Sequence, residues 1–313
     1  MKVAIVQNKP RKGDVAANLA ELGAIFAQLA AEPEPYDLIV LPEAALTGYF
    51  LEGAVFELAF EATDLAARIA ETWRRSPGAA RASVDIALGF YENADGTFYN
   101  AALYLHVDGA EHRIEHVHRK MFLPTYGVFD EGRFLSRGRR LQAFATRFGR
   151  MAILICEDAW HAIMPTLAAI KGARTVIVPS ASPGRGFAGD GELESVVHWR
   201  NILSSYAAEH GVFVLYASLA GFEGGKGMTG SSMAIDPFGD TLAELPALGA
   251  HVLRVQLDYS DIEVARARLP LLGDLGAVLP DLLYDDELFP NDAYRRTRLP
   301  MEPAPLPAPE TAL

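Results

Sequence analysis

Cysteine is almost absent from this 313-residue sequence, in which Cys156 is the single example. One thiol cannot form an intramolecular disulfide, and it cannot build a Cys₄ or Cys₂His₂ zinc site. Among the eight histidines, His116 and His118 have the spacing of a ligand pair, but no third ligand accompanies them. We therefore expect neither a disulfide nor a metal centre.

Long apolar runs are also missing. No segment reaches the roughly 18 apolar residues of a transmembrane helix, so we expect no membrane association. The apolar stretch at residues 3–6 is too short for the core of a signal peptide. Together with the lone thiol, which suits a reducing compartment, these absences predict a cytoplasmic protein.

Positive charge is scarce as well. The sequence has 28 lysines and arginines against 40 aspartates and glutamates, a formal net charge of −12. Such a surface repels phosphates unless a local basic patch intervenes. The basic clusters at residues 137–140 and 295–296 are short and contain no aromatic residues for stacking on bases. We expect no nucleic-acid partner.

Hydrophobic residues make up 50% of the chain, which favours a globular protein with a large core. Short apolar runs typical of buried strands alternate with segments whose apolar residues recur at helical spacing. Strands are predicted at residues 3–6, 37–42, 86–90, 99–107, 141–148, 151–155, 175–179, 212–216, 232–235 and 252–257. Helices are predicted from Asp14 to the stretch 31–35, and at residues 58–75, 162–171 and 192–209. Turns at residues 93–96, 149–150 and 236–240 predict hairpins between the strands that flank them.

This order predicts an α/β architecture with a mixed sheet. Two stacked sheets with helices outside and an open doubly wound sheet both fit the periodicity. Because no interior linker is visible, residues 1–268 are expected to form one domain. Residues 269–313 are rich in proline and show few helix or strand patterns, so we expect an arm that is extended or disordered alone and lies over a neighbouring surface.

Three residues with reactive side chains stand at the boundaries of apolar runs. Cys156 follows Ile155 at the end of an apolar run. It could be a reactive nucleophile or simply a buried apolar cysteine. Glu43 follows the strand at residues 37–42; it could move protons or simply favour a helix N-terminus. Lys120 lies where a basic stretch meets an apolar one, either as a solvated charge or as an enclosed ammonium that stabilises an oxyanion.

The order and spacing of these residues are more informative than any one of them. Leu41-Pro42-Glu43, Arg119-Lys120-x-x-Leu-Pro and Ile155-Cys156-Glu157-Asp158 resemble the three signature blocks of the nitrilase (carbon-nitrogen hydrolase) superfamily, in the family's order. The similarity extends over roughly residues 1–260.

The resemblance implies a role for each of these residues. Glu43 would be the general base, Lys120 the oxyanion stabiliser and Cys156 the nucleophile. Glu131 would be the second glutamate that many members carry, although a solvated loop acid beside Asp130 is the alternative. The backbone N–H of Glu157 would help to hold the oxyanion. No metal or organic cofactor would be required.

The resemblance also implies a fold and an assembly. Family members are four-layer α-β-β-α sandwiches whose subunits pair into a longer stack. The final strands and the C-terminal arm commonly hold that dimer, and residues 269–313 would suit this role.

Residues near the catalytic motifs could line the substrate pocket. Tyr49 and Tyr126 follow two of the motifs, although aromatic core filler is the alternative for both. Trp160 follows the nucleophile, and Ser180 and Ser182 follow the strand at residues 175–179. The serines could contact a substrate carboxylate. The glycine-rich run 221–227 is expected to be a loop, either flexible beside the pocket or purely structural.

Residues 46–49, 126–131 and 156–160 resemble the corresponding segments of the glutaminase domain of glutamine-dependent NAD synthetase. However, the 313 residues contain no Ser-Gly-Gly-x-Asp-Ser loop, and the lysine that follows Ser-x-Ser-Pro in that branch is missing. We therefore favour a free-standing amidase for a small linear amide, an N-carbamoyl compound or a glutamine-like ω-amide. A glutaminase subunit that feeds a separate synthetase, a nitrile hydrolase and a catalytically silent binding protein are the alternatives.

Overall fold

The computed structural model describes residues 1–188 and 191–283. Residues Met1–Leu272 form one compact unit that contains two six-stranded sheets. The first sheet has the order β14 (His251–Gln256), β1 (Lys2–Gln7), β2 (Leu38–Val40), β3 (Val84–Ala94), β4 (Thr97–Asp108), β5 (Glu111–Arg119). The second has the order β13 (Thr241–Glu244), β12 (Met233–Ile235), β9 (Phe213–Ser218), β8 (Thr175–Ser180), β7 (Gly149–Ile153), β6 (Phe144–Thr146).

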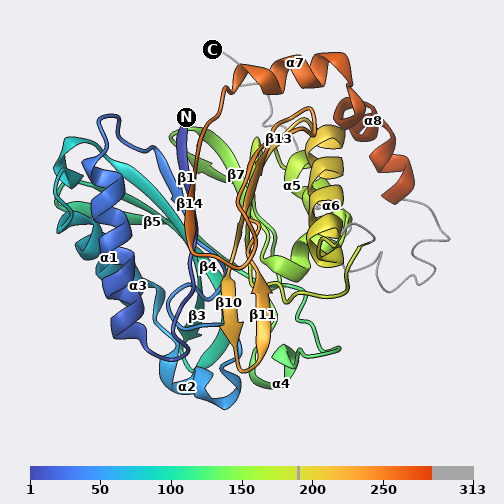
Figure 1. Ribbon diagram of the computed structural model, residues 1–313. Helices are drawn as coiled ribbons and strands as arrows, with labels where there is room; N and C mark the ends of the chain where they lie inside the picture. Colours follow the sequence, from blue (N-terminus) through green and yellow to red (C-terminus); the bar gives the residue numbers. More distant parts are fainter. Residues whose placement is uncertain (189–190, 284–313) are drawn as a thin grey trace, which may run out of the picture. The chain divides into compact units, whose positions relative to one another are not determined.

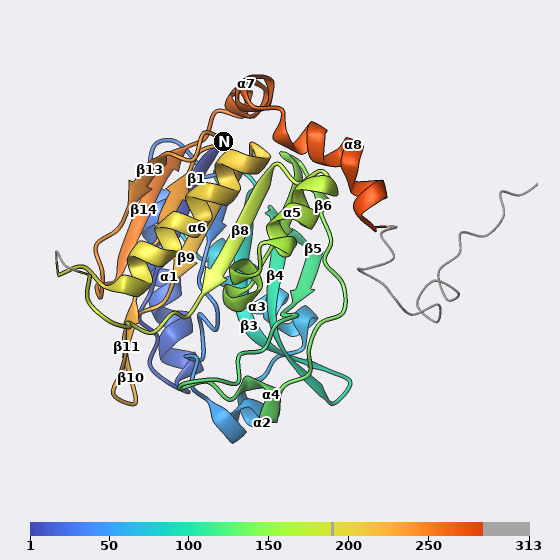
Figure 2. The same ribbon diagram turned by 90° about the vertical axis from the view of Figure 1, so that its right-hand side faces the viewer.

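Helices cover the outer faces of the two sheets. Helices α1 (Val15–Ala31) and α3 (Ala62–Arg74) lie on the first sheet, and α5 (Ile163–Ile170) and α6 (Glu194–His210) lie on the second (Figures 1 and 2). This arrangement is the four-layer α-β-β-α sandwich that the resemblance implies. The open doubly wound sheet is wrong, because the strands form two separate sheets.

Alternation along β1 shows why two sheets form. Val3 and Ile5 belong to the core between the sheets, whereas Ala4 and Val6 pack in the core beneath α1 and α3. Side chains of successive strand residues point to opposite faces, so an all-apolar strand needs a cover on both. An uninterrupted apolar run therefore becomes an inner strand of the sandwich.

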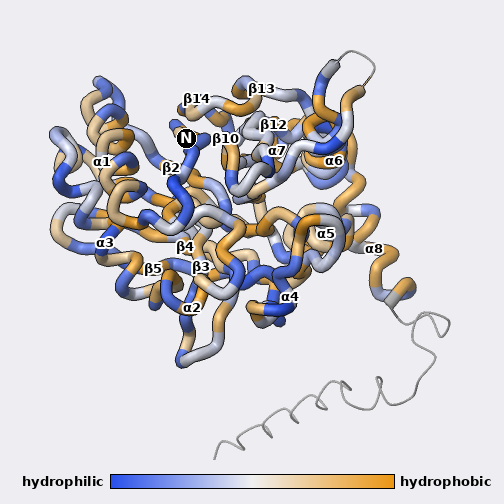
Figure 3. The backbone as a smooth tube through the Cα atoms, turned by 60° about the horizontal axis from the view of Figure 1, so that its bottom comes forward, coloured by the Kyte–Doolittle hydropathy of each residue, from blue (hydrophilic) through white to orange (hydrophobic). Residues whose placement is uncertain are grey.

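Helix α1 illustrates how local sequence sets the outer layer. Asp14 caps it by accepting a 3.0 Å hydrogen bond from the backbone N–H of Ala17. Leu22, Phe26 and Leu29 recur at helical spacing and are buried, and each contributes about 1.5–3 kcal/mol. The tube in Figure 3 accordingly alternates between hydrophobic and hydrophilic residues along α1.

Most predicted strands form, but the last predicted hairpin is wrong. Strand β12 pairs with β13, immediately after the turn at residues 236–240. Strand β14 instead pairs antiparallel with β1, with Lys2 opposite Gln256 and Gln7 opposite His251. Strand β13 is the segment nearest to β12 along the chain, so pairing with it costs the least loop entropy. Strand β14 is then free to pair with the open edge of β1.

The glycine-rich run is also more ordered than expected. Strands β10 (Ala220–Glu223) and β11 (Lys226–Thr229) form an antiparallel hairpin. Gly224 and Gly225 connect them with φ values of +54° and +81°. Two positive φ values in a two-residue loop are the requirement of the hairpin turn that glycine meets most easily. The prediction of a loop is therefore wrong over most of residues 221–227.

Further short helices complete the described chain: η1 (Glu52–Ala54), α2 (Val55–Leu58), η2 (Ala79–Arg81), α4 (Glu131–Phe134), η3 (Cys156–Trp160) and α7 (Ser260–Arg268). Helix α3 thus begins at Ala62, later than the predicted start at residue 58. The described part of the chain has no helix with the length and apolar character needed to cross a membrane.

The region after residue 268 differs from its prediction. Residues Leu271–Leu283 form helix α8, with Pro280 inside it. The expectation of few helical patterns is wrong there because Leu272, Leu275, Leu279 and Leu282 recur every three or four residues. Residues 284–313 lie outside the described residues, and the role of the arm in a dimer stays a prediction.

Candidate active site

Strand ends bring the three predicted catalytic side chains into the interior. Glu43 follows β2, Lys120 directly follows β5, and Cys156 begins η3 just after β7. Glu43 and Lys120 have exposed fractions of 0%, and Cys156 has 7%. Chain leaving a strand end is free of the sheet's hydrogen-bond ladder, so its side chains can converge on one point.

Lys120 lies between two carboxylates. Its Nζ is 2.8 Å from Glu43 Oε1 and 2.9 Å from Glu131 Oε1. Asn100 Nδ2 donates to the same two oxygens, at 2.7 Å and 3.0 Å, and the Tyr49 hydroxyl donates to Glu131 Oε1 at 2.5 Å. Burying a charge is costly unless it is paired, and Lys120 is paired with both carboxylates. The second oxygens, Glu43 Oε2 and Glu131 Oε2, accept no hydrogen bond within the described residues.

Electrostatics fix the protonation of the lysine. Burial alone would lower the pKa of Lys120, but the carboxylates of Glu131 and Glu43 outweigh burial and hold that pKa well above its ordinary value. Burial raises the pKa of Glu131, while the Lys120 charge acts in the opposite direction. The site therefore holds a permanent ammonium beside carboxylates.

Cys156 sits in a strained and enclosed position. Its φ is +43°, a left-handed conformation that is uncommon for residues other than glycine and concentrates at functional sites. Burial and the Glu43 charge raise the pKa of Cys156, and Lys120 and a 3.3 Å hydrogen bond from Ser180 Oγ partly offset them. At neutral pH the resting sulfur is thus a thiol, with a carboxylate close enough to influence its ionisation.

Asp158 joins the cysteine turn to the lysine turn. Its Oδ1 accepts from the backbone N–H groups of Met121 and Phe122 at 2.9 Å and 3.0 Å. Its Oδ2 accepts from the Ile155 N–H at 3.1 Å and lies 2.9 Å from His118 Nε2. One fully buried carboxylate therefore fixes the backbone just before the sulfur and just after the ammonium.

A small cleft of about 20 Å³ opens above Cys156. Its walls include Tyr126, Glu157, Trp160, Ser182 and Arg185. Tyr126 and Trp160 have exposed fractions of 46% and 36%, so the cleft faces outward. Burial and the Glu157 carboxylate raise the pKa of Tyr126 to about 12, and its hydroxyl donates to Glu157 Oε2 at 2.8 Å.

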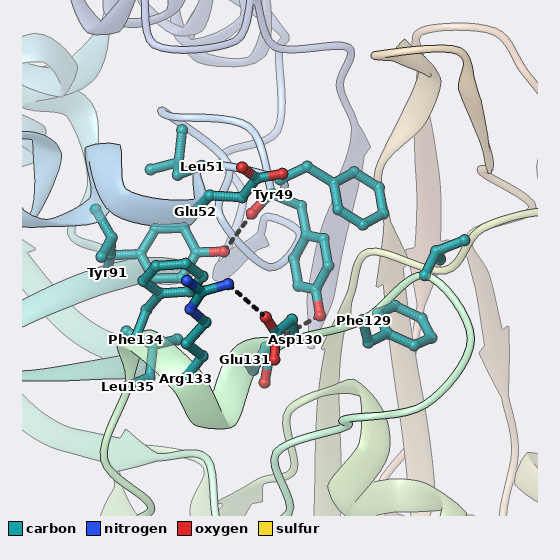
Figure 4. Close-up of a pocket in the computed structure, with 13 residues that line it drawn as sticks. Tyr49, Leu51, Glu52, Tyr91, Phe129, Asp130, Glu131, Arg133, Phe134 and Leu135 are labelled. Carbon is teal, nitrogen blue, oxygen red and sulfur yellow. Dashed lines mark hydrogen bonds and ion pairs between the residues drawn. The ribbon is translucent and has the colours of Figure 1, made fainter.

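A larger cavity of about 220 Å³ lies next to this cleft, and Cys156 is not on its wall (Figure 4). Its lining includes Tyr49, Tyr91, Phe129 and Glu131. In Figure 4 the Tyr49 hydroxyl points toward Glu131. Phe129 lines both spaces and so forms a wall common to them. The reactive sulfur belongs to the smaller space, so the reacting group of a substrate must enter there.

The structure brings most of the predicted site residues together, though not all as expected. Tyr126, Trp160 and Ser182 line the cleft. Tyr49 instead belongs to the buried charge network, and Ser180 is fully buried against the sulfur. The role of the Glu157 N–H toward an oxyanion stays a prediction. Over residues 1–188 and 191–283, no three His, Cys, Asp or Glu side chains are grouped to hold a metal ion.

Two buried polar residues of this region were missed from the sequence. Asn100 lies within β4 and donates to both glutamates. Glu223 in β10 accepts from the backbone N–H groups of Tyr49 and Phe50 at 2.9–3.0 Å, and so holds the turn after Glu43. A polar residue inside an otherwise apolar strand was the available signal for Asn100.

Known proteins resemble this chain in sequence and in fold. A glutamine-dependent NAD(+) synthetase of Thermotoga maritima is 28% identical over 263 residues, 83% of this chain and 42% of that protein. An (R)-stereoselective amidase of a Pseudomonas species is 31% identical over 277 residues, 88% of this chain and 91% of the amidase. The carbon-nitrogen hydrolase of Helicobacter pylori G27 superposes with a TM-score of 0.79 at 22% identity, covering 90% of this chain and 98% of that one.

The synthetase match is partial, since this chain spans less than half the length of that relative. The family profile named Carbon-nitrogen hydrolase matches residues 2–267, which is most of the sequence. The chain belongs to the carbon-nitrogen hydrolase (nitrilase) family.

Proposed function

We propose that this protein is a cysteine-dependent amidohydrolase that cleaves a small linear amide or N-carbamoyl compound through a thioester intermediate. The observation that carries the proposal is the buried set of Glu43, Lys120 and Cys156, in which both charged groups influence the ionisation of one strained thiol. The cleft of about 20 Å³ above the sulfur favours a small reacting group.

The residues support the following sequence of steps. Glu43 removes the proton from the Cys156 thiol as sulfur attacks the amide carbon. Lys120 and the Glu157 N–H stabilise the oxyanion that forms as the carbonyl π bond opens. Glu43 then gives its proton to the departing ammonia or amine as the carbon–nitrogen bond breaks. Water, deprotonated by the same carboxylate, cleaves the thioester and restores the thiol.

Glu131 holds the lysine in place in this scheme. It shares Lys120 with Glu43 and receives hydrogen bonds from Asn100 and Tyr49 through the same oxygen. With three donors on one oxygen, Glu131 is suited to orient the ammonium, while Glu43 is the carboxylate whose charge acts on the Cys156 thiol. Each glutamate has a second oxygen that makes no hydrogen bond within the described residues, and in this scheme Glu43 Oε2 accepts the thiol proton.

The test is ammonia release from a panel of linear amides and ureido acids, combined with mass spectrometry of Cys156. We expect turnover of at least one compound and an acyl adduct on Cys156 at early times. Cys156→Ala should abolish both and leave the melting temperature close to wild type, since the change in volume is small. Failure of the wild-type protein to release ammonia or form an adduct with any compound would favour a silent binding protein.

A glutaminase that supplies a separate synthetase is the second candidate, supported by the 28% identity to the Thermotoga maritima NAD(+) synthetase. Glutamine hydrolysis by the isolated protein would favour the free-standing amidase. Hydrolysis that begins only when an NAD synthetase is added would favour the glutaminase subunit.

A further inference from the structure

Arg185 lies on the wall of the cleft that contains Cys156. Its side chain is exposed, and within residues 1–188 and 191–283 no carboxylate forms an ion pair with its guanidinium. By contrast Arg119, near the catalytic lysine, forms a two-pronged pair with Glu92. Arg185 is therefore a cation at the mouth of the site with its hydrogen-bond donors available.

The position of Arg185 is nevertheless well supported. Its backbone N–H donates to Ser195 Oγ at 3.3 Å, and its carbonyl accepts from the Ser195 N–H at 3.4 Å. The guanidinium lies 5.5 Å from the Tyr126 ring and 5.2 Å from the Phe129 ring, within the range of a cation–π contact. The buried Ser195 and two rings thus hold the cation beside the cleft.

Two acidic side chains lie near Arg185. Glu157 lines it and accepts from the Tyr126 hydroxyl. Glu194 lies against Gly186, the next residue after Arg185. Among the described residues that line the cleft, Arg185 carries the positive charge and Glu157 the negative charge. A substrate tail must therefore meet Arg185 without bringing its own negative charge onto Glu157. A planar guanidinium binds a carboxylate through two parallel hydrogen bonds, which a neutral or cationic tail cannot match.

We infer that Arg185 binds a carboxylate at the far end of the substrate, so that the substrate is an amide or ureido compound with an anionic tail. The inference rests on the proposed function and specifies the class of its substrate. The small space above the sulfur receives the amide or ureido head, and the tail extends to the open side where Arg185 lies. The tail is either a simple carboxylate or the carboxylate of an α-amino acid, whose ammonium Glu157 would accept.

The first experiment does not depend on turnover. Cys156 is alkylated with iodoacetamide at fixed pH, and protection by glutarate, glutamate or butyrate is followed by intact mass. Glutarate or glutamate should protect at lower concentration than butyrate, which has no second carboxylate. Arg185→Gln should raise the half-protecting concentration about 10- to 100-fold, as expected for loss of a hydrogen-bonded charge pair. Arg137→Gln, an exposed arginine on a different groove, is the matched control and should leave protection unchanged.

The second experiment compares kcat/KM for butyramide, glutaramic acid (the monoamide of glutarate) and glutamine. Wild type should prefer the compounds with a carboxylate tail, and Arg185→Gln should reduce the ratio of their kcat/KM to that of butyramide by about 10- to 100-fold. The Glu157→Gln variant distinguishes the two kinds of tail. It should lower kcat/KM for glutamine relative to kcat/KM for glutaramic acid only if Glu157 binds the amino group.

The outcomes separate this inference from the proposed function. Suppose that the wild-type protein hydrolyses amides, and that Arg185→Gln shows the same substrate preference and the same protection of Cys156 by carboxylates. This result would overturn the carboxylate site and leave the amidohydrolase function intact. Absence of hydrolysis and of any acyl adduct would overturn the proposed function. The protection experiment would then still decide whether Arg185 binds carboxylates.

Discussion

Two neighbouring regions of this molecule are built in opposite ways. Lys120 and Glu43 are buried just after strand ends, and Glu131 is buried at the start of α4. The Asn100 and Tyr49 donors complete this network. The cleft above Cys156 is bordered by exposed side chains, among them Tyr126, Trp160 and Arg185. The difference teaches that the reaction is fixed by the sheets, whereas the choice of substrate is left to the loops.

Among changes to the buried network, Glu43→Gln should cause the largest loss of activity. The amide cannot accept the thiol proton, so we expect kcat/KM to fall by about 10²- to 10⁴-fold, the usual contribution of a general base. Steady-state hydrolysis measures the loss, with Glu61→Gln on the surface as a control that keeps full activity. Because one carboxylate serves both half-reactions, an acyl-enzyme that accumulates in Glu43→Gln would contradict the scheme.

Gly89→Ala should disturb the same region through the backbone alone. A Cβ at this position would lie 2.4 Å from Glu43 Cα and 2.8 Å from the Pro42 carbonyl oxygen. The displaced backbone should cost about 1–3 kcal/mol of stability, and activity should fall about tenfold or more as Glu43 moves.

The matched control for this change is Gly53→Ala, because a Cβ there meets nothing within 4 Å. The Gly53→Ala variant should stay close to wild type both in stability, measured by chemical denaturation, and in kcat/KM. A Gly89→Ala protein with normal stability and activity would mean that the approach of β3 to Glu43 is not needed to hold the carboxylate.

The same substitution in both regions sharpens the contrast. Tyr49→Phe removes a donor to the buried, charged Glu131, and should destabilise the protein by about 1.5–3 kcal/mol. Tyr126→Phe removes an exposed hydrogen bond to Glu157, and its effect should stay below about 1 kcal/mol with at most a few-fold change in KM. Urea denaturation compares the two variants. Equal losses of stability would remove the distinction between a rigid network and an adaptable cleft.

The sequence predicted the buried region better than the cleft for a physical reason. Glu43 and Cys156 follow apolar runs, and that local pattern places them at strand ends. Lys120 instead precedes an apolar stretch, and the strand before it, β5, was not predicted. Arg185 was not singled out, because nothing in a loop sequence marks which exposed cation faces a pocket. Asn100 was missed because its partners lie 57 and 31 residues away.

Long-range pairing was hidden from the sequence for a similar reason. The apolar patterns of β12 and β14 fit either sheet, and only the tertiary fold gives β14 to β1. Glu223 was overlooked in a glycine-rich run that favours loops, although its carboxylate holds the backbone of Tyr49. Local periodicity finds elements, but register between distant strands depends on which edges remain free.

The proposed mechanism requires Cys156, Lys120 and Glu43 to act as one coupled unit. The pH dependence of Cys156 alkylation is the most direct test of this coupling. Burial and Glu43 raise the thiol pKa, so the rate in wild type should keep rising above pH of about 8.5, where an ordinary thiol is half ionised. Lys120→Met removes a charge that lowers this pKa and should move the midpoint to still higher pH, whereas Glu43→Gln should move it lower. Identical midpoints in all three proteins, at the value of a free thiol, would contradict the coupling of sulfur, ammonium and carboxylate.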